Sequence, residues 1–148
     1  MIDCEMILGY WFGAHPDTAA LAKERADLWW SINAGVDREI RERFESTVQS
    51  AGYGNLDPWL AEPRGRLALI IFTDQFPRNI YRDSPRAFAL DVQALELSLT
   101  GIDQGHDRLL RPIERLFYYL PLEHSERLAH QERSVRLIGE LVSIVDAD

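Results

Sequence analysis

The residues best suited to chemistry lie in two short stretches, Asp74–Asn79 and Glu123–Glu126. The first reads Asp-Gln-Phe-Pro-Arg-Asn and follows the most hydrophobic run of the chain, so its carboxylate is expected to be at least partly buried. A buried carboxylate needs a partner that neutralises it or donates hydrogen bonds to it. Arg78 and Arg82 are close in sequence and available. This stretch is therefore the principal candidate site.

Two interpretations fit Asp74–Asn79. In the structural one, an ion pair or cap holds the turn at Pro77. In the functional one, Arg78 and Arg82 bind an anionic ligand through their planar guanidinium groups, and Asp74 and Asn79 orient them. The predicted ligand-binding residues are Gln75, Arg78, Asn79, Arg82 and Glu123.

The second stretch reads Glu-His-Ser-Glu. Ser125 is expected to cap the helix that follows, with Glu126 in the first turn of that helix. His124 has no such structural role, and histidine is the side chain most readily used for proton transfer near neutral pH. Because a pairing with Asp74 would orient the imidazole ring, Asp74 and His124 are the catalytic candidates.

Other kinds of site find less support. Glu123, His124, Glu126 and His130 are metal-ligand types, but they lack the spacing that places two ligands on one helix face. Ser125 has no Gly-x-Ser-x-Gly context, and the chain has no glycine-rich phosphate loop. We therefore expect no metal and no cofactor.

The elements that position these residues are predicted to be helices, about 7–8 in all, arranged as antiparallel hairpins in an orthogonal or superhelical bundle. Leu67–Phe72 fits a buried strand or a buried helix, and we favour a helix because a lone strand would have no partner. Asp37 and Ser84 are predicted N-caps, and Pro77 and Pro121 are predicted to end helices. The expected helices cover about residues 2–12, 16–31, 37–51, 67–76, 84–102, 113–120 and 125–145.

Side-chain periodicity predicts which helix faces are buried. The last two long helices each carry an apolar stripe. These stripes are Phe88, Val92, Leu95, Leu99 and Ile102, and then Leu128, Val135, Ile138, Val142 and Val145. Neighbouring helix residues point about 100° apart, so Trp29 and Trp30 cannot both be buried on one side. One of the two is expected to be exposed or to meet a partner.

Composition bounds the class of protein. The 148 residues fit one domain, 1–148, with a net charge of −8. That charge argues against nucleic acid and against an anionic membrane surface as partners. Cys4 is the only cysteine, no basic n-region precedes an apolar segment, and the longest apolar run is too short to span a bilayer. A reducing, cytoplasmic location is the simple expectation.

Three segments closely resemble a known family: residues 9–13, 67–82 and 116–126. Within them, the strings Asp-Gln-Phe-Pro-Arg-Asn and Tyr-Leu-Pro-Leu-Glu-His-Ser-Glu are long and unusual. The chain is similar over most of its length to the bacterial domain-of-unknown-function family 924. That resemblance implies an all-α fold like that of tetratricopeptide-repeat (TPR) proteins, and it implies no activity. Family members usually continue with a Phe-Gly-Arg-Phe-Pro-His-Arg-Asn-like string, whereas this sequence ends at Asp148, so a site completed by that string would be partial here.

Three functional hypotheses remain. The first is a helical binding module that holds a small anionic ligand, or a peptide or protein partner, near Asp74, Arg78 and Arg82. The second is a hydrolase-type acid–base enzyme that uses Asp74 and His124. The third is a structural or oligomerising helical protein in which both stretches are internal ion pairs. The sequence leaves the choice open.

Overall fold

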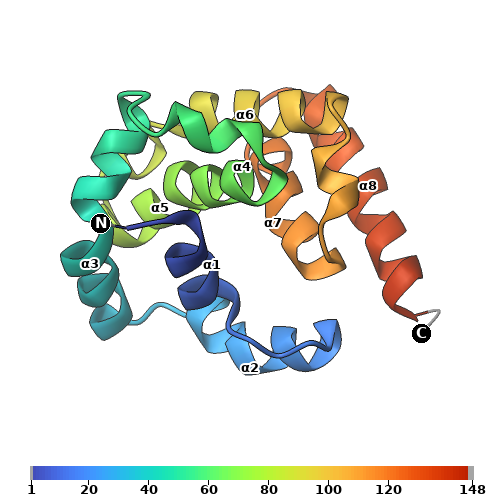
Figure 1. The fold of residues 1–148 in the computed structure, drawn as a ribbon, viewed down its shortest axis with the longest axis horizontal. Coiled ribbons are helices and arrows are strands. Elements are labelled where there is room, and N and C mark those ends of the chain that lie inside the picture. Colours follow the sequence, from blue (N-terminus) through green and yellow to red (C-terminus); the bar gives the residue numbers. More distant parts are fainter. Residues whose placement is uncertain (1, 147–148) are drawn as a thin grey trace.

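The computed structural model describes residues 2–146, and every regular element in that range is helical (Figure 1). Its α-helices are α1 Cys4–Phe12, α2 Thr18–Trp30, α3 Ala34–Gly52, α4 Pro63–Ile70, α5 Phe76–Ile80, α6 Asp91–Asp103, α7 Pro112–Glu123 and α8 Leu128–Asp146. Short 3-10 helices cover Asp57–Ala61, Pro85–Phe88 and His106–Leu109, and a π turn, Ile71–Gln75, joins α4 to α5. The predicted all-α fold is confirmed. The end of the chain at Asp148 lies outside the described residues.

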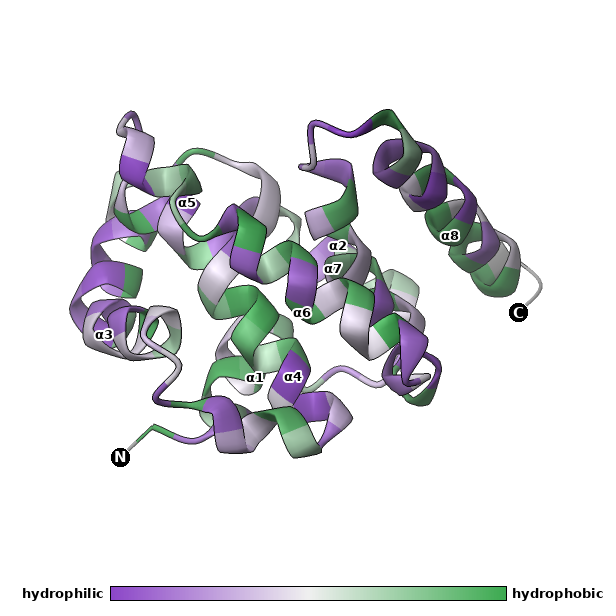
Figure 2. Ribbon diagram, turned by 90° about the horizontal axis from the view of Figure 1, so that it is seen from above, coloured by the Kyte–Doolittle hydropathy of each residue, from purple (hydrophilic) through white to green (hydrophobic). Residues whose placement is uncertain are grey.

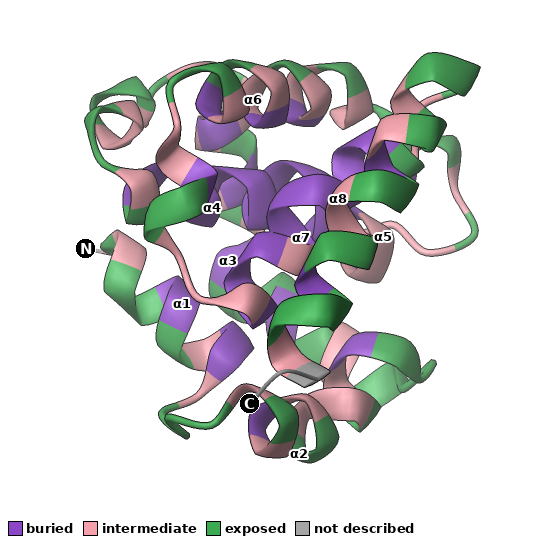
Figure 3. Ribbon diagram, turned by 90° about the vertical axis from the view of Figure 1, so that its right-hand side faces the viewer, coloured by how far each residue is buried: buried purple, intermediate pink, exposed green. Residues whose placement is uncertain are grey.

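Helix α4 lies at the centre of the fold, with α1, α6 and α7 packed against it (Figure 1). Helix α3 packs on α5, and α8 packs along α7. Figure 3 shows buried residues concentrated on α4 and α7. Every side chain of Leu67–Phe72 is at most 3% exposed. This segment is a helix, as predicted, and its apolar character is continuous because neighbouring helices cover it on several sides.

Aromatic side chains join the first two helices to α7. The rings of Trp29 and Phe117 lie 4.7 Å apart, and Trp11 packs edge-on against Phe117 at 5.6 Å. Edge-to-face contacts of this kind add to the stabilisation that comes from burial. Trp29 is 8% exposed and Trp30 is 57% exposed. The prediction that only one of the two tryptophans is buried is confirmed.

Contrary to the prediction, the helix that carries the candidate site does not end at Pro77 but continues to Ile80. A proline ring inside a helix clashes with the carbonyl four residues earlier, here that of Thr73. The π turn Ile71–Gln75 widens the backbone immediately before the proline, and π turns of this kind often occur at functional sites. The Thr73 hydroxyl donates to the Leu69 carbonyl at 2.8 Å and so satisfies a group near the widened turn.

Pro121 also lies inside a helix and does not end it, contrary to the prediction, because α7 continues to Glu123. A proline so close to a helix end removes one backbone hydrogen bond without stopping the last turn. The backbone resumes its pattern directly, since His124 N donates to the Leu120 carbonyl at 3.0 Å. The extra turn places His124 at the C-cap of α7.

The predicted start of α3 is also wrong. The helix begins at Ala34 and is capped by Asn33, whose Oδ1 accepts from Gly35 N at 2.9 Å and Val36 N at 3.1 Å. Asp37 therefore lies in the first turn of α3 and not at the N-cap. Its carboxylate is left available for a partner on another element.

Two predicted serine caps have different outcomes. Ser84 Oγ accepts from Arg86 N at 3.2 Å, but it caps only the short helix Pro85–Phe88, and α6 begins separately at Asp91. Ser125 does not cap α8, which begins three residues later than expected. Its hydroxyl accepts from Arg127 N at 3.2 Å, closing a local turn. Glu126 accordingly precedes the helix.

The predicted buried face of α6 is wrong. Its buried residues are Ala94, Ser98 and Gly101, while Phe88 and Val92 are 60% and 71% exposed. The reason is close packing: a Cβ atom on Gly101 would lie 1.7 Å from the hydroxyl of the buried Tyr118. Only small residues fit where the two helices approach so closely.

The predicted apolar stripe of α8 is mostly exposed, because this helix packs mainly on α7 (Figures 2 and 3). Its buried residues are Ser134 and Leu141. Leu128, Val135 and Val142 lie largely in solvent. No helix within residues 2–146 combines the length and apolar character needed to cross a bilayer.

Candidate functional site

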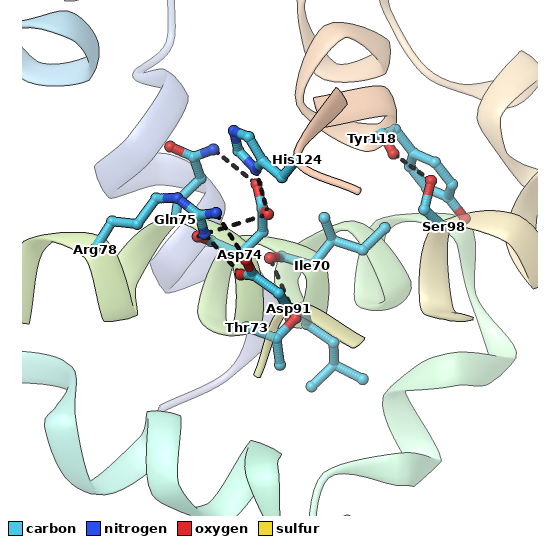
Figure 4. A network of polar contacts seen from close by, with 10 residues as sticks. Ile70, Thr73, Asp74, Gln75, Arg78, Asp91, Ser98, Tyr118 and His124 are labelled. Atoms are coloured by element: carbon cyan, nitrogen blue, oxygen red, sulfur yellow. Dashed lines mark hydrogen bonds and ion pairs between the residues drawn. The ribbon is translucent and has the colours of Figure 1, made fainter. Parts of the chain in front are cut away.

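Asp74 lies within the π turn, and its carboxylate is fully buried (Figure 4). Gln75 Nε2 donates to Oδ2 at 2.9 Å. Oδ1 lies 2.8 Å from His124 Nδ1 and 3.5 Å from Arg78 Nη1. Groups that can donate thus surround both oxygens, which is the arrangement a buried carboxylate requires.

His124 reaches Asp74 from the end of α7, 50 residues away in sequence. An ionised carboxylate can only accept hydrogen bonds. With Asp74 in that form, the proton of this contact lies on Nδ1, and Nε2 is the nitrogen left to exchange protons. Within the described residues, no hydrogen bond involves Nε2, and 27% of the His124 side chain is exposed. The imidazole therefore connects a buried carboxylate to the surface.

Arg78 is held mainly by Asp91, a residue that no sequence pattern singles out. Nη1 and Nη2 donate to the two oxygens of Asp91 at 2.9 and 3.0 Å, and Nη1 also donates to the Asp74 carbonyl. The guanidinium lies over the Phe88 ring, 5.4 Å from its centre. An acidic residue in the first turn of a helix is common for electrostatic reasons, so Asp91 carried no distinguishing sequence signal.

Asn79 and Arg82 donate hydrogen bonds to a different carboxylate, that of Asp37 on α3. Asn79 Nδ2 donates to Asp37 Oδ1 at 3.0 Å, and Arg82 Nε donates to Oδ2 at 2.7 Å. Burial raises the pKa of Asp37, but hydrogen bonds from Arg82 and Asn79 outweigh burial and hold that pKa below its ordinary value. The ion pair borders a cavity of about 250 Å³ that is also lined by Arg38 and Arg41.

Glu123, the remaining predicted ligand residue, lies apart from both clusters. It is exposed and lines a groove between α7 and α8 together with Trp30. The structure thus brings Asp74, Gln75, Arg78 and His124 together, and it places the other predicted residues in two separate surroundings.

The residues considered as metal ligands do not converge. His130 Nδ1 lies 2.8 Å from Ser125 Oγ, and His124 pairs with Asp74. In the described part of the chain, no group of three or more His, Cys, Asp or Glu side chains is arranged to hold a metal ion.

A second buried carboxylate, Asp107, was not singled out from the sequence. It is 1% exposed, and its Oδ2 accepts from the Tyr119 hydroxyl at 2.5 Å. That hydroxyl in turn accepts from Arg115 Nε at 3.1 Å. Burial and the hydrogen bond to Asp107 raise the pKa of Tyr119 to about 12. Asp107 Oδ1 and the Tyr118 hydroxyl are buried with no partner among the described residues.

Comparison with known proteins places the chain in a family. A family model described as "Bacterial protein of unknown function (DUF924)" matches residues 7–148. The chain belongs to this family. The solved structure of a protein of unknown function, ATU0120 from Agrobacterium tumefaciens, is 31% identical and superposes with a TM-score of 0.71. That match covers 88% of this chain and 84% of the other. No curated protein matches. The stretch matched by the DUF924 model contains both Asp74 and His124.

Proposed function

We propose that this DUF924 protein is an acid–base catalyst of hydrolase type in which Asp74 orients His124. The observation that carries the proposal is the 2.8 Å contact between Asp74 Oδ1 and His124 Nδ1. Asp74 is fully buried and His124 is partly exposed, so the carboxylate orients the ring while Nε2 faces outward. In that orientation Nε2 can take a proton from a water molecule and return it to a leaving group.

The other contacts of Asp74 support this role. Gln75 Nε2 donates to Oδ2 of Asp74. Arg78 lies 3.5 Å from Oδ1 of Asp74 and is itself fixed by Asp91. The carboxylate therefore has little freedom to rotate away from His124. A restrained carboxylate stabilises one tautomer of the ring and the imidazolium that forms during proton transfer.

The test is a panel of small ester, amide and phosphoester substrates assayed with the wild type and three variants. We expect His124→Ala to lower the rate of any hydrolysis found by about 100-fold or more. Asp74→Asn should lower the rate too, since the amide can favour the wrong tautomer. His130→Ala is the matched control, because His130 lies in the first turn of α8 and contacts Ser125 instead of Asp74.

The proposal fails if the purified protein hydrolyses nothing on the panel. It also fails if His124→Ala and His130→Ala are equally active. Circular dichroism and the melting temperature of each variant separate lost chemistry from lost structure.

A second candidate function, binding of a small anion, is favoured by the cavity beside Asp37. Arg38, Arg41 and Arg82 line it with a single carboxylate, so it is locally positive in a chain whose net charge is −8. Hydrogen bonds with Asp37 also raise the pKa of Arg82. Guanidinium groups gathered around a small cavity suit a phosphate or carboxylate group.

Calorimetric titration with inorganic phosphate and with a small dicarboxylate tests this second function. Arg38→Ala should weaken binding by about tenfold, since each charge-assisted hydrogen bond contributes roughly 1.5–3 kcal/mol. Arg43→Ala on the same helix is the control, because Arg43 pairs with Glu39 and does not line the cavity. Absence of binding by the wild type would contradict this function and leave the catalytic proposal untouched.

A further inference from the structure

The outward face of α8 carries three apolar side chains at equal spacing. Leu128, Val135 and Val142 are 68%, 73% and 55% exposed. Seven residues complete nearly two helical turns, with a drift of about 20°, so the three side chains form one straight stripe. Apolar residues at this spacing are the pattern by which one helix packs against another.

A groove runs beside this stripe. It has a volume of about 810 Å³, and its walls include Val135 and Val142 from α8, Leu116 and Leu120 from α7, and Trp30 from the end of α2. Trp30 is more than half exposed. The exposed stripe and the apolar walls of the groove together offer a surface on which another helix can pack.

We propose that this face binds α8 of a second copy of the chain, antiparallel, about a two-fold axis that passes next to Val135. The stripe is self-complementary in that arrangement. Because Leu128 and Val142 are equally distant from Val135, a two-fold rotation places Leu128 opposite the second copy's Val142 and Val135 opposite its own counterpart. Isologous contacts of this kind close after two subunits.

The charges beside the stripe favour the same arrangement. At about 100° per residue, Glu132 and Arg136 lie about 60° and 100° from Val135, on the same side of the helix. A two-fold axis perpendicular to both helices brings this side of one helix next to the same side of the other. The two helices then run in opposite directions. Glu132 therefore comes next to the second copy's Arg136, and the contact is repeated by symmetry. In a parallel pair the two-fold axis runs along the helices and brings opposite sides of the two helices together, so this ion pair does not form.

Sedimentation equilibrium of the whole protein over a wide concentration range tests the association. We expect a mass of twice the 17.0 kDa chain at high concentration. Val135→Asp should raise the dissociation constant by about tenfold or more, because it buries an unpaired charge at the centre of the contact. Leu109→Asp is the matched control, since Leu109 is 74% exposed but lies on the 3-10 helix His106–Leu109, away from α8. A single-chain mass at every concentration overturns the proposal, as does an equal effect of both variants.

Cysteine cross-linking tests the orientation. In a Cys4→Ser background, Val135→Cys should form a disulfide-linked dimer on mild oxidation, because a disulfide needs two Cα atoms about 4.4–6.8 Å apart. Val142→Cys alone should not form one, whereas a mixture with Leu128→Cys should. Self-linking by both Val135→Cys and Val142→Cys would show parallel helices and overturn the antiparallel arrangement. The charge swap gives an independent result: Arg136→Glu should weaken the dimer, and adding Glu132→Arg should restore it.

Discussion

Asp74 and Asp107 are both fully buried carboxylates, yet their surroundings differ. Both oxygens of Asp74 have partners, and one of these, His124, reaches solvent. Asp107 has one oxygen bonded to Tyr119 and the other without a partner, and Tyr119 is fully buried. Burial alone therefore does not mark a reactive group. What distinguishes Asp74 is its connection to the surface through the His124 imidazole.

The largest expected difference between the two regions is in stability. Asp107→Ala should lower the free energy of unfolding by roughly 3–5 kcal/mol, because the buried Tyr119 hydroxyl loses its acceptor and the buried Arg115, which bonds to that hydroxyl, loses the carboxylate behind it. Asp74→Ala should lower it by only about 1–3 kcal/mol, since Arg78 keeps Asp91 and His124 can turn to water. Urea unfolding of both variants measures the difference. Equal losses would mean that Asp74 is as much a structural group as Asp107.

Close packing around Tyr118 gives the next effect. Gly101→Ala should destabilise the protein by about 1–3 kcal/mol, because the new methyl group would overlap the Tyr118 hydroxyl. Gly139→Ala on α8 is the control: a Cβ there meets nothing within 4 Å, and alanine should stabilise the helix by about 0.4–1 kcal/mol. Changes of opposite sign in the melting temperature would sharpen the contrast between the close-packed interior around Tyr118 and the exposed face of α8. A loss for both would contradict it.

Alkaline pH separates the two carboxylates in a third way. The pKa of Tyr119 is about 12 in the folded protein, against about 10 for a free tyrosine, so its contribution to stability is complete below pH 10 and is lost as pH rises towards 12. We expect a loss of about 1–2 kcal/mol over that range. Asp107→Asn should reduce the loss and Asp74→Asn should not. Urea unfolding at several pH values, with phenolate absorbance followed in parallel, provides the measurement.

The smallest expected effect concerns the π turn that carries Asp74. Thr73→Val removes hydroxyl contacts to the Leu69 and Ile70 carbonyls and should lower the free energy of unfolding by about 1 kcal/mol. The same change should shift the NMR signals of the His124 ring, because the turn positions its carboxylate partner. Ser143→Val, which removes a similar hydroxyl contact on the exposed α8, should leave those signals in place. Unchanged His124 signals in both variants would show that the turn does not position Asp74.

The helical class and several helix positions follow from local patterns. Asp17 caps α2 close to the expected start of that helix at residue 16, with its carboxylate accepting from Ala20 N at 2.9 Å. The burial of Leu67–Phe72 follows from its unbroken apolar run. Local signals suffice in these places because the contacts that decide them lie within one turn or within one segment.

The errors have the opposite character. Pro77 and Pro121 read as helix ends, but the π turn and the position of the proline in the last turn of α7 depend on how neighbouring helices pack. Small residues, not the larger apolar ones, face the core on α6 because Tyr118 approaches it closely. The contact between Asp74 and His124 was hypothesised from residue type alone. The pairing of Asp91 with Arg78 and of Asp37 with Arg82 could not be predicted. An acidic residue in a first helical turn is common and gives no information about a partner elsewhere in the chain.

The position of Trp30 allows its fluorescence to report on the state of the groove. Its indole stacks on Phe117, with the ring centres 5.8 Å apart, while its outer surface stands in the groove. Trp11 and Trp29 are buried. Iodide should therefore quench Trp30 in the native state and reach those two only after unfolding. The difference between the emission spectra of the wild type and Trp30→Phe isolates the emission of Trp30. Burial of the groove by a partner and unfolding of the core can then be followed separately, without an added fluorophore.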